Sequence, residues 1–216
     1  LAERARRDLE LFAYPPRDWV LPREDAEGPE LDVAVVGGGQ SGLAVAFALR
    51  RARIRNVLVF DGSPAGQEGP WVTFARMVTL RTIKELTGPA LGQPALAFRS
   101  WYEAQHGSAA WEAMARIPKG DWMRYLGWLR DTLDLPVASG TRVTGIRPAG
   151  GALALDVLGP DGARTVLARK VVVATGLLGS GGPRLPAFTE TLSRRRWAHS
   201  TDPVDFAALA GRRVLV

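Results

Sequence analysis

The stretch Leu31–Gly42, LDVAVVGGGQSG, constrains the fold of this chain more than any other, because it joins a strand pattern to a helix start within a few residues. Residues 31–36 are almost entirely apolar and rich in Val, which is typical of a parallel strand buried on both faces. Gly37, Gly39 and Gly42 then form the pattern G-x-G-x-x-G. In a dinucleotide-binding fold these three glycines allow, in turn, a tight turn, the close approach of a pyrophosphate, and close packing of helix on strand.

The residues that flank the glycines indicate what the pattern means. A helix is predicted from Ser41 to about Arg51, and its free N–H groups and positive dipole end would face the phosphates. A second strand, Asn56–Asp61, ends in a carboxylate at the spacing where such folds hold the ribose hydroxyls, so Asp61 is the predicted ribose ligand. The alternative is a glycine-rich turn followed by a strand-capping aspartate. The order of strand, glycines, helix, strand and acid favours the dinucleotide site.

Composition excludes several classes of protein. The 216 residues are 46% hydrophobic, enough for one large or two small domains with a proper core. The net charge of +6 comes mostly from arginines spread along the chain, without the interleaved aromatic residues of a nucleic-acid site, so no nucleic-acid partner is expected. The absence of cysteine removes disulfides, thiolate metal sites and catalytic thiols, and no metal site is predicted.

The first part of the chain carries no targeting pattern. No apolar run approaches the roughly 20 residues that span a bilayer, so no membrane span is expected. Residues 1–30 contain five Arg and eight Asp or Glu and lack the apolar core of a signal peptide. They begin with a helical pattern and continue through several prolines, which indicates an arm packed on the main domain. We expect a cytoplasmic protein.

Beyond Asp61 a loop precedes a long segment with a helical pattern. A loop at 62–69 leaves the end of the second strand, where ligands are commonly contacted. Aromatic and apolar residues at spacings of three and four predict helices between Phe98 and Leu135, with Asp121 as the N-cap of the last one. The aromatic stripe is either core or a substrate cage, and its helical spacing favours core.

Strand patterns return after Pro136. Alternating segments at 141–148, 152–158 and 164–169, separated by turn residues, predict a three-stranded antiparallel meander. A continuous apolar strand, Lys170–Thr175, is then expected to rejoin the parallel sheet. The predicted fold is therefore α/β, a Rossmann-type domain with a parallel sheet, an antiparallel β-meander and a helical insert.

The order of these motifs resembles the flavin-containing monooxygenases, a branch of the flavoproteins with two dinucleotide-binding domains. GGGQSGLA at 37–44 looks like that family's FAD fingerprint. FDGSPAGQEGPW at 60–71 looks like its acidic strand end and G-G-x-W-type loop, here altered to G-P-W. VVVATG at 171–176 is similar to the A-T-G motif that closes the FAD domain. The resemblance implies cofactor contacts from Gly37, Gly39, Gln40, Ser41, Gly42, Asp61, Gly62, Gln67, Trp71, Val143, Ala174, Thr175 and Gly176.

The resemblance also implies a domain organisation. RRVLV at 212–216 is similar to the first strand of the family's NAD(P)H-binding domain, here truncated, so the second nucleotide site would lie largely outside this chain. The implied parts are an arm at 1–30 and an FAD-binding domain at 31–211. Within that domain the helical insert covers about 72–135 and the meander about 137–169.

Two residues stand where the family has active-site positions. Arg81, in TLRTIKE, occupies the place of an active-site Asn in many members and is the predicted catalytic residue. His199 matches the histidine of the F-x-G-x-x-x-H motif, but Arg195 replaces its glycine. A structural hydrogen bond is favoured over proton transfer as the role of His199.

The family's chemistry defines the expected function. The resemblance implies an FAD-dependent, NADPH-linked monooxygenase, in which a flavin hydroperoxide passes one oxygen atom to a small-molecule substrate, and a homo-oligomer is compatible with it. A pyridine-nucleotide disulfide reductase is excluded within this chain, because it needs a C-x-x-C pair. Two alternatives stay open: a module that binds or senses FAD without turnover, and another flavoprotein reductase of two dinucleotide domains without a redox disulfide.

Overall fold

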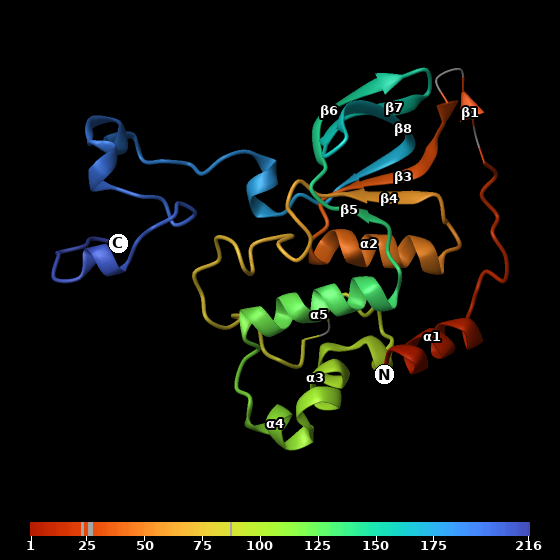
Figure 1. Ribbon diagram of the computed structural model, residues 1–216, viewed down its shortest axis with the longest axis horizontal. Coiled ribbons are helices and arrows are strands. Elements are labelled where there is room, and N and C mark those ends of the chain that lie inside the picture. Colours follow the sequence, from red (N-terminus) through yellow and green to blue (C-terminus); the bar gives the residue numbers. More distant parts are fainter. Residues whose placement is uncertain (23, 26–27, 87) are drawn as a thin grey trace.

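The computed structural model describes residues 1–22, 24–25, 28–86 and 88–216, and Figure 1 shows its ribbon. The helices and strands follow in the order α1 (Ala2–Leu11), β1 (Glu24–Asp25), β2 (Gly28–Pro29), β3 (Leu31–Val36), α2 (Gln40–Arg51), β4 (Val57–Phe60), α3 (Phe98–His106), α4 (Ser108–Ala113), α5 (Lys119–Thr132), β5 (Val137–Ala138), β6 (Arg142–Ala149), β7 (Ala152–Gly159) and β8 (Gly162–Val173). Short 3₁₀ turns lie at Pro94–Leu96, Leu177–Ser180, Ala187–Thr191, Arg194–Arg196 and Ala207–Leu209.

One mixed sheet organises the chain, with the strand order β5-β4-β3-β8-β7-β6. β3 pairs in parallel with β4 on one side and with β8 on the other, and β5 continues the parallel part beyond β4. β6 and β7 extend the sheet past β8 as an antiparallel meander. The predicted α/β class, with a Rossmann-type parallel sheet and a meander, is confirmed.

β8 corrects one prediction about the strands. The sequence predicted a meander strand at 164–169 and a separate parallel strand at Lys170–Thr175, but β8 is one continuous strand. It pairs with β7 up to Ala168 and with β3 from Ala168 to Val173. The change of hydrophobic pattern marks a change of neighbours along a single strand, because residues 170–173 pair with β3 and no longer with β7.

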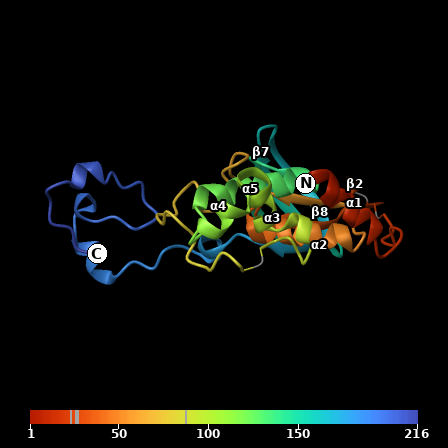
Figure 2. The ribbon, with the colours of Figure 1, turned by 90° about the horizontal axis from the view of Figure 1, so that it is seen from below.

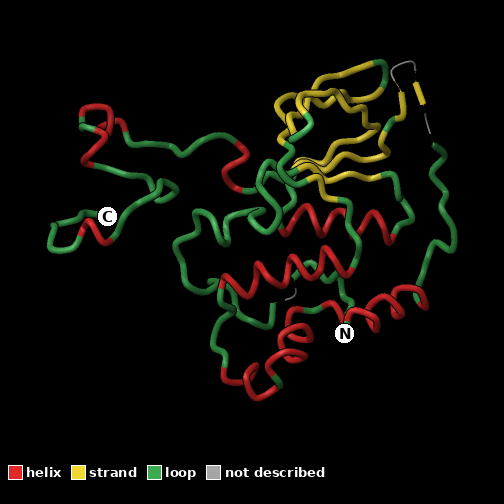
Figure 3. The backbone as a smooth tube through the Cα atoms, viewed as in Figure 1, coloured by secondary structure: helices red, strands yellow, loops and turns green. Residues whose placement is uncertain are grey.

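The helices form layers on one face of the sheet. Figures 1 and 3 show α2 against the strands, α5 beyond α2, and α3 and α4 beyond α5. Buried residues of β3, α2 and α5 make one core with the aromatic side chains of the helices. A second, smaller core joins Ala34 and Phe60 of the parallel strands to Leu155, Val157 and Ala168 of the meander. β3 is therefore covered on both faces, as its unbroken apolar run predicts.

The aromatic stripe between α3 and α5 belongs to the core, as its spacing favoured. Phe98, Trp101, Trp111, Trp122 and Tyr125 are all buried. The rings of Trp122 and Tyr125 lie 5.2 Å apart between centroids, and those of Phe98 and Tyr125 lie 5.4 Å apart with their planes nearly perpendicular. Burial raises the pKa of Tyr125, whose hydroxyl donates to the Leu96 carbonyl at 2.8 Å.

Two local predictions need correction. The N-cap of α5 is Pro118, so Asp121 lies in the first turn, where it pairs with Arg124 and still favours the positive end of the helix. The helices of the insert begin at Phe98, as the aromatic spacing predicts, and residues 72–86 and 88–93 before them are largely irregular. Residues 137–138, which were placed in the meander, form β5 at the parallel edge instead.

The C-terminal part of the chain extends away from the sheet. In Figures 1 and 2 residues from about 181 onward project to one side of the body. Residues 212–216, predicted as a first Rossmann strand, are irregular here. A central strand needs neighbouring strands to satisfy its backbone groups, and the described residues offer none beside it. The division into domains stays a prediction. In the described part of the chain, none of the helices is long and apolar enough to cross a membrane.

Candidate dinucleotide-binding site

The glycine turn after β3 packs tightly against the ends of the two neighbouring strands, β4 and β8. Gly37 has φ +110° and donates its N–H to the Phe60 carbonyl at 2.7 Å. A Cβ on Gly37 would lie 2.4 Å from the Ala174 carbonyl oxygen, closer than any side chain tolerates. A Cβ on Gly42 would lie 1.8 Å from the Gly37 oxygen. Glycine at these two positions is therefore required for the fold, whether or not a ligand binds.

Gly39 is different, because a Cβ there would make only ordinary van der Waals contact with the rest of the chain. It is the N-cap of α2 with φ −70°, a conformation open to any residue. A Cβ on Gly39 would meet nothing nearer than the Cα of Gly69 at 3.8 Å. The lack of a side chain at this position keeps room for a ligand rather than for another part of the chain.

The start of α2 has no side-chain cap. The N-cap residue is Gly39, and the first intrahelical hydrogen bond runs from the Leu43 N–H to the Gly39 carbonyl. The N–H groups of the first turn, including that of the exposed Ser41, therefore have no intrahelical acceptor. Together with the helix dipole they form an anion site. Gln40 is tied to the helical layer, since its side-chain oxygen accepts the Trp122 indole N–H at 3.2 Å.

Asp61 lies at the mouth of the turn. One carboxylate oxygen accepts the Gly38 N–H and the other accepts the Ser63 N–H, each at 2.7 Å. The carboxylate is thus fixed in direction, and each oxygen keeps acceptor capacity for a hydroxyl group. This arrangement suits the ribose role predicted for Asp61.

Trp71 brings a donor to the same place from the loop after β4. Its indole nitrogen is buried and has no hydrogen-bond partner among the described residues. A Cβ on Gly69 would lie 3.7 Å from this nitrogen and 3.9 Å from the Cα of Gly39, so the indole and the glycine turn flank the same space. Burying an N–H without an acceptor costs free energy. An unpaired buried indole N–H is therefore expected where the oxygen of a ligand accepts from it. Trp197 has a similar indole nitrogen, but it lies in the C-terminal segment.

The end of β8 closes the site. The Ala174 N–H donates to the Val36 carbonyl at 2.8 Å, which holds the strand end against β3. Thr175 and Gly176 follow as exposed residues, and Gly176 has φ +71°. The carboxyl ends of β3, β4 and β8 therefore meet at one edge of the sheet, where open α/β sheets bind their ligands.

Three other residues predicted to contact the cofactor lie on β6 and on the loop after β4. Val143 is half-buried on β6, in the segment that Thr141 joins to the Asp61 carbonyl by a 2.7 Å hydrogen bond. Gly62 lies under the guanidinium of Arg142. Gln67 is exposed on the loop, and the structure gives its side chain no contact with the glycine turn.

A buried acid under this loop was missed by the sequence analysis. Glu68 is 4% exposed and pairs with Arg130 of α5 at 3.3 Å. It also accepts hydrogen bonds from Ser139 at 3.0 Å and from the Gly66 N–H at 2.8 Å. A buried carboxylate with three partners fixes the loop against α5 and the chain after β5. A lone acid in a Gly/Pro-rich loop carries no spacing that could have indicated these partners.

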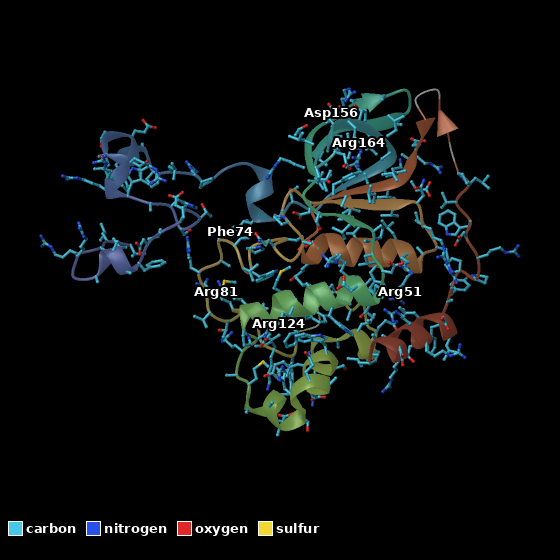
Figure 4. All side chains as sticks on the ribbon, viewed as in Figure 1. Arg51, Phe74, Arg81, Arg124, Asp156 and Arg164 are labelled. Carbon is cyan, nitrogen blue, oxygen red and sulfur yellow. The ribbon has the colours of Figure 1, made fainter. Side chains whose placement is uncertain are left out.

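Arg81 lies apart from this cluster. Figure 4 shows it beyond the N-terminal end of α5, on the side that faces the C-terminal segment. Its carbonyl accepts a hydrogen bond from Arg116, and the neighbouring Leu80 N–H donates to Ile117 at 2.8 Å. Among the described residues, no hydrogen bond or ion pair joins the Arg81 side chain to the glycine turn. Its catalytic role stays a prediction.

His199 is held in a turn of the C-terminal segment. Its Nδ1 lies 2.7 Å from the Thr201 hydroxyl, and its backbone N–H donates to Asp202 at 2.6 Å. A hydrogen bond from Arg194, followed by the one from the His199 backbone, lowers the pKa of the Asp202 carboxyl. The structural hydrogen bonding favoured for His199 is therefore present.

Glycine turn, open helix start, strand-end acid and converging parallel strands together define a Rossmann-type dinucleotide-binding domain. Residues 34–178, more than half of the chain, match the family described as FAD-NAD(P)-binding. The chain belongs to this family.

Two characterised relatives are similar in sequence. The chain is 49% identical over 210 residues to the FAD-dependent urate hydroxylase of Xanthomonas campestris pv. campestris, a match that covers 97% of this chain and 44% of that protein. It is 36% identical over 96 residues to the salicylate hydroxylase of Pseudomonas putida, covering 40% of this chain and 21% of that one. The chain thus spans less than half the length of these relatives.

Solved structures agree with this placement. The ornithine N-hydroxylase of Kutzneria sp. 744, described with reduced FAD, NADP⁺ and L-ornithine, aligns with a TM-score of 0.59 at 25% identity over 74% of this chain and 39% of its own. The flavin-containing monooxygenase of Stenotrophomonas maltophilia aligns with a TM-score of 0.52 at 27% identity, covering 69% and 39%. The predicted resemblance to flavin-containing monooxygenases is confirmed.

The residues present fit the diphosphate of FAD. The uncapped start of α2, Gly39 and the unpaired indole N–H of Trp71 lie close together around Gly69. Among the described residues, two independent kinds of donor, first-turn backbone N–H groups and an indole, therefore lie close together without an acceptor. An anionic group bridging two nucleotide halves satisfies both.

Trp71→Phe should separate FAD affinity from folding stability. Loss of the indole N–H removes a hydrogen bond to a charged group, worth about 1.5–3 kcal/mol, so FAD should bind roughly 10- to 100-fold more weakly. The apo protein should lose little stability, because the substitution also removes an unpaired buried donor. Titration of apo protein with FAD and a thermal melt measure the two effects. Trp128→Phe, on the half-buried Trp128 of α5, is the matched control. An unchanged FAD Kd in Trp71→Phe would contradict this role.

Proposed function

We propose that this chain is the FAD-binding part of an FAD-dependent, NADPH-linked monooxygenase that hydroxylates a small molecule. The observation that carries the proposal is the pairing of two kinds of unsatisfied donor, the first-turn N–H groups of α2 and the Trp71 indole, near the carboxyl edge of β3 and β4. The 49% identity to a urate hydroxylase over nearly the whole chain supports the reaction class.

Each residue of the site has a definite task in this proposal. The first-turn N–H groups of α2 hold the diphosphate, and Gly39 leaves room for it. Asp61 accepts the ribose hydroxyls, while Trp71 donates to the ligand from the opposite side. The strand end from Ala174 to Gly176 borders the same edge. Bound FAD supplies the redox and oxygen chemistry, so no nucleophilic side chain is needed.

Urate is the substrate that we propose to test first. The urate hydroxylase matches this chain far more extensively than the salicylate hydroxylase does, at 97% against 40% of the chain. The overall reaction consumes substrate, NADPH, a proton and O₂, and gives hydroxylated product, NADP⁺ and water. NADPH as reductant favours a cytoplasmic location, and a small molecule is the only partner that the reaction requires. A homo-oligomer stays a prediction.

The function can be tested on a protein in which this chain continues into a second dinucleotide-binding domain. With FAD bound, addition of urate should accelerate NADPH oxidation and O₂ uptake in equal amounts, whereas salicylate should not. NADPH oxidation that urate does not accelerate and that forms no hydroxylated product would favour a reductase. FAD binding with no NADPH oxidation at all would favour a module that only holds FAD.

A further inference from the structure

We propose that Arg142, at the start of β6, forms the platform on which the adenine ring of the bound dinucleotide stacks. The inference rests on the proposed function, because Asp61 as ribose ligand determines where the base lies. Nothing in the sequence patterns pointed to Arg142. The structure places it next to Gly62, the residue that follows Asp61.

The orientation of the guanidinium is the first argument. A Cβ built on Gly62 would lie 3.1 Å from Arg142 Cζ, 3.1 Å from Nη2 and 3.3 Å from Nε. An edge-on approach would bring the nitrogens nearer than the central carbon, so the guanidinium presents its flat face to Gly62. A Cβ at position 62 would make the guanidinium give way by a few tenths of an ångström, and a larger side chain by more. Glycine at 62 therefore allows a planar cation to lie over the strand end beside Asp61.

The position is fixed by the backbone. The Thr141 N–H donates to the Asp61 carbonyl at 2.7 Å, and the Gly140 N–H donates to the Ser63 carbonyl at 2.8 Å. These two bonds tie the chain just before Arg142 to the end of β4. The backbone that carries Arg142 and the ribose-binding Asp61 are thus joined locally, although 81 positions separate Asp61 from Arg142 in the sequence.

The second argument is that Arg142 has no other task. It is exposed, and among the described residues it forms no hydrogen bond, ion pair or cation–π contact. Arg147, on the same strand, pairs with Asp156 at 2.8 Å. One face of the Arg142 guanidinium lies over Gly62, and the residue is otherwise exposed. A planar, weakly hydrated cation stacks favourably on an aromatic ring, and the base next to a ribose held by Asp61 is such a ring.

The test compares adenine-containing ligands on four proteins: wild type, Arg142→Ala, Arg142→Lys and Arg147→Ala. Loss of the platform should raise the Kd for FAD about 5- to 30-fold in Arg142→Ala, with a similar factor for AMP in competition. Arg142→Lys should not restore the affinity, because lysine keeps the charge but lacks the plane. Arg147→Ala should bind like wild type.

Gly62→Val supplies an independent arm, since it displaces the guanidinium without removing it. It should weaken FAD binding as Arg142→Ala does, and the two changes together should cost little more than either alone. Wild-type affinity in Arg142→Ala, or full rescue by lysine, would overturn the proposal. So would adenosine 2′,5′-bisphosphate that binds more tightly than AMP through Arg142, because that result marks a 2′-phosphate site. Failure of wild type to bind FAD would instead reject the proposed function.

Discussion

Gly39→Val should abolish FAD binding while the domain stays folded. The new side chain meets no protein atom closely, since the nearest atom to its Cβ is the Cα of Gly69 at 3.8 Å. It fills the space in front of the first turn of α2, so the diphosphate loses its backbone donors. Two charge-assisted hydrogen bonds at about 1.5–3 kcal/mol each predict a Kd raised by at least about 100-fold.

Folding should respond only weakly to the same change. Valine is a poorer N-cap than glycine by about 1 kcal/mol, which lowers the melting temperature of a domain of this size by roughly 2–4 °C. Retained visible flavin absorbance after gel filtration of Gly39→Val would contradict the assignment of this loop.

Gly42→Ala and Gly120→Ala are the matched controls. A Cβ at Gly42 overlaps the Gly37 oxygen at 1.8 Å, so the helix must move off the strand and the fold should lose about 3 kcal/mol or more. A Cβ at Gly120, in α5, meets only the Arg124 guanidinium at 3.8 Å and should leave both FAD affinity and folding intact. The three variants each place a side chain at a glycine, yet only Gly39→Val should separate binding from stability.

The second prediction concerns the rate at which NADPH reduces the bound flavin. The 216-residue chain should bind FAD but be reduced by NADPH only slowly, compared with the same chain continued into a second dinucleotide-binding domain. In the described part of the chain, α2 is the one helix of the sheet layer that starts at a glycine turn of this kind, and FAD is expected to occupy it. Residues 212–216 offer neither a glycine turn nor a following helix.

Hydride transfer requires the nicotinamide to be held against the flavin. Positioning of two reactants accounts for roughly 7–11 kcal/mol of barrier lowering, so its loss should slow reduction by at least about 10³-fold. Anaerobic stopped-flow bleaching of the flavin band against NADPH concentration measures the rate and its saturation. The short chain should show a slow, non-saturating rate. Equal rates and equal saturation in the two proteins would show that one domain serves both nucleotides.

Much of the binding site could be predicted because its parts lie close together in the sequence. The residues from Leu31 to Asp61 contain the strand, the glycine turn, the helix start and the acid, and the structure places all four as expected. Each depends on a short-range rule: alternation or continuity of apolar residues, backbone freedom of glycine, and the free N–H groups of a helix start. Such rules act within one βαβ unit and need no knowledge of the remaining chain.

The tertiary structure alone decided the contacts that come from distant segments. Glu68 pairs with Arg130, and Arg142 covers Gly62, only because α5 and β5 return the chain to the edge of β4. The continuity of β8 likewise depends on which strands lie beside it. Propensity and periodicity report how one segment buries its own apolar face. Which side chain of a second segment then lies above it is determined by the packing of layers across the whole domain, which no local pattern encodes.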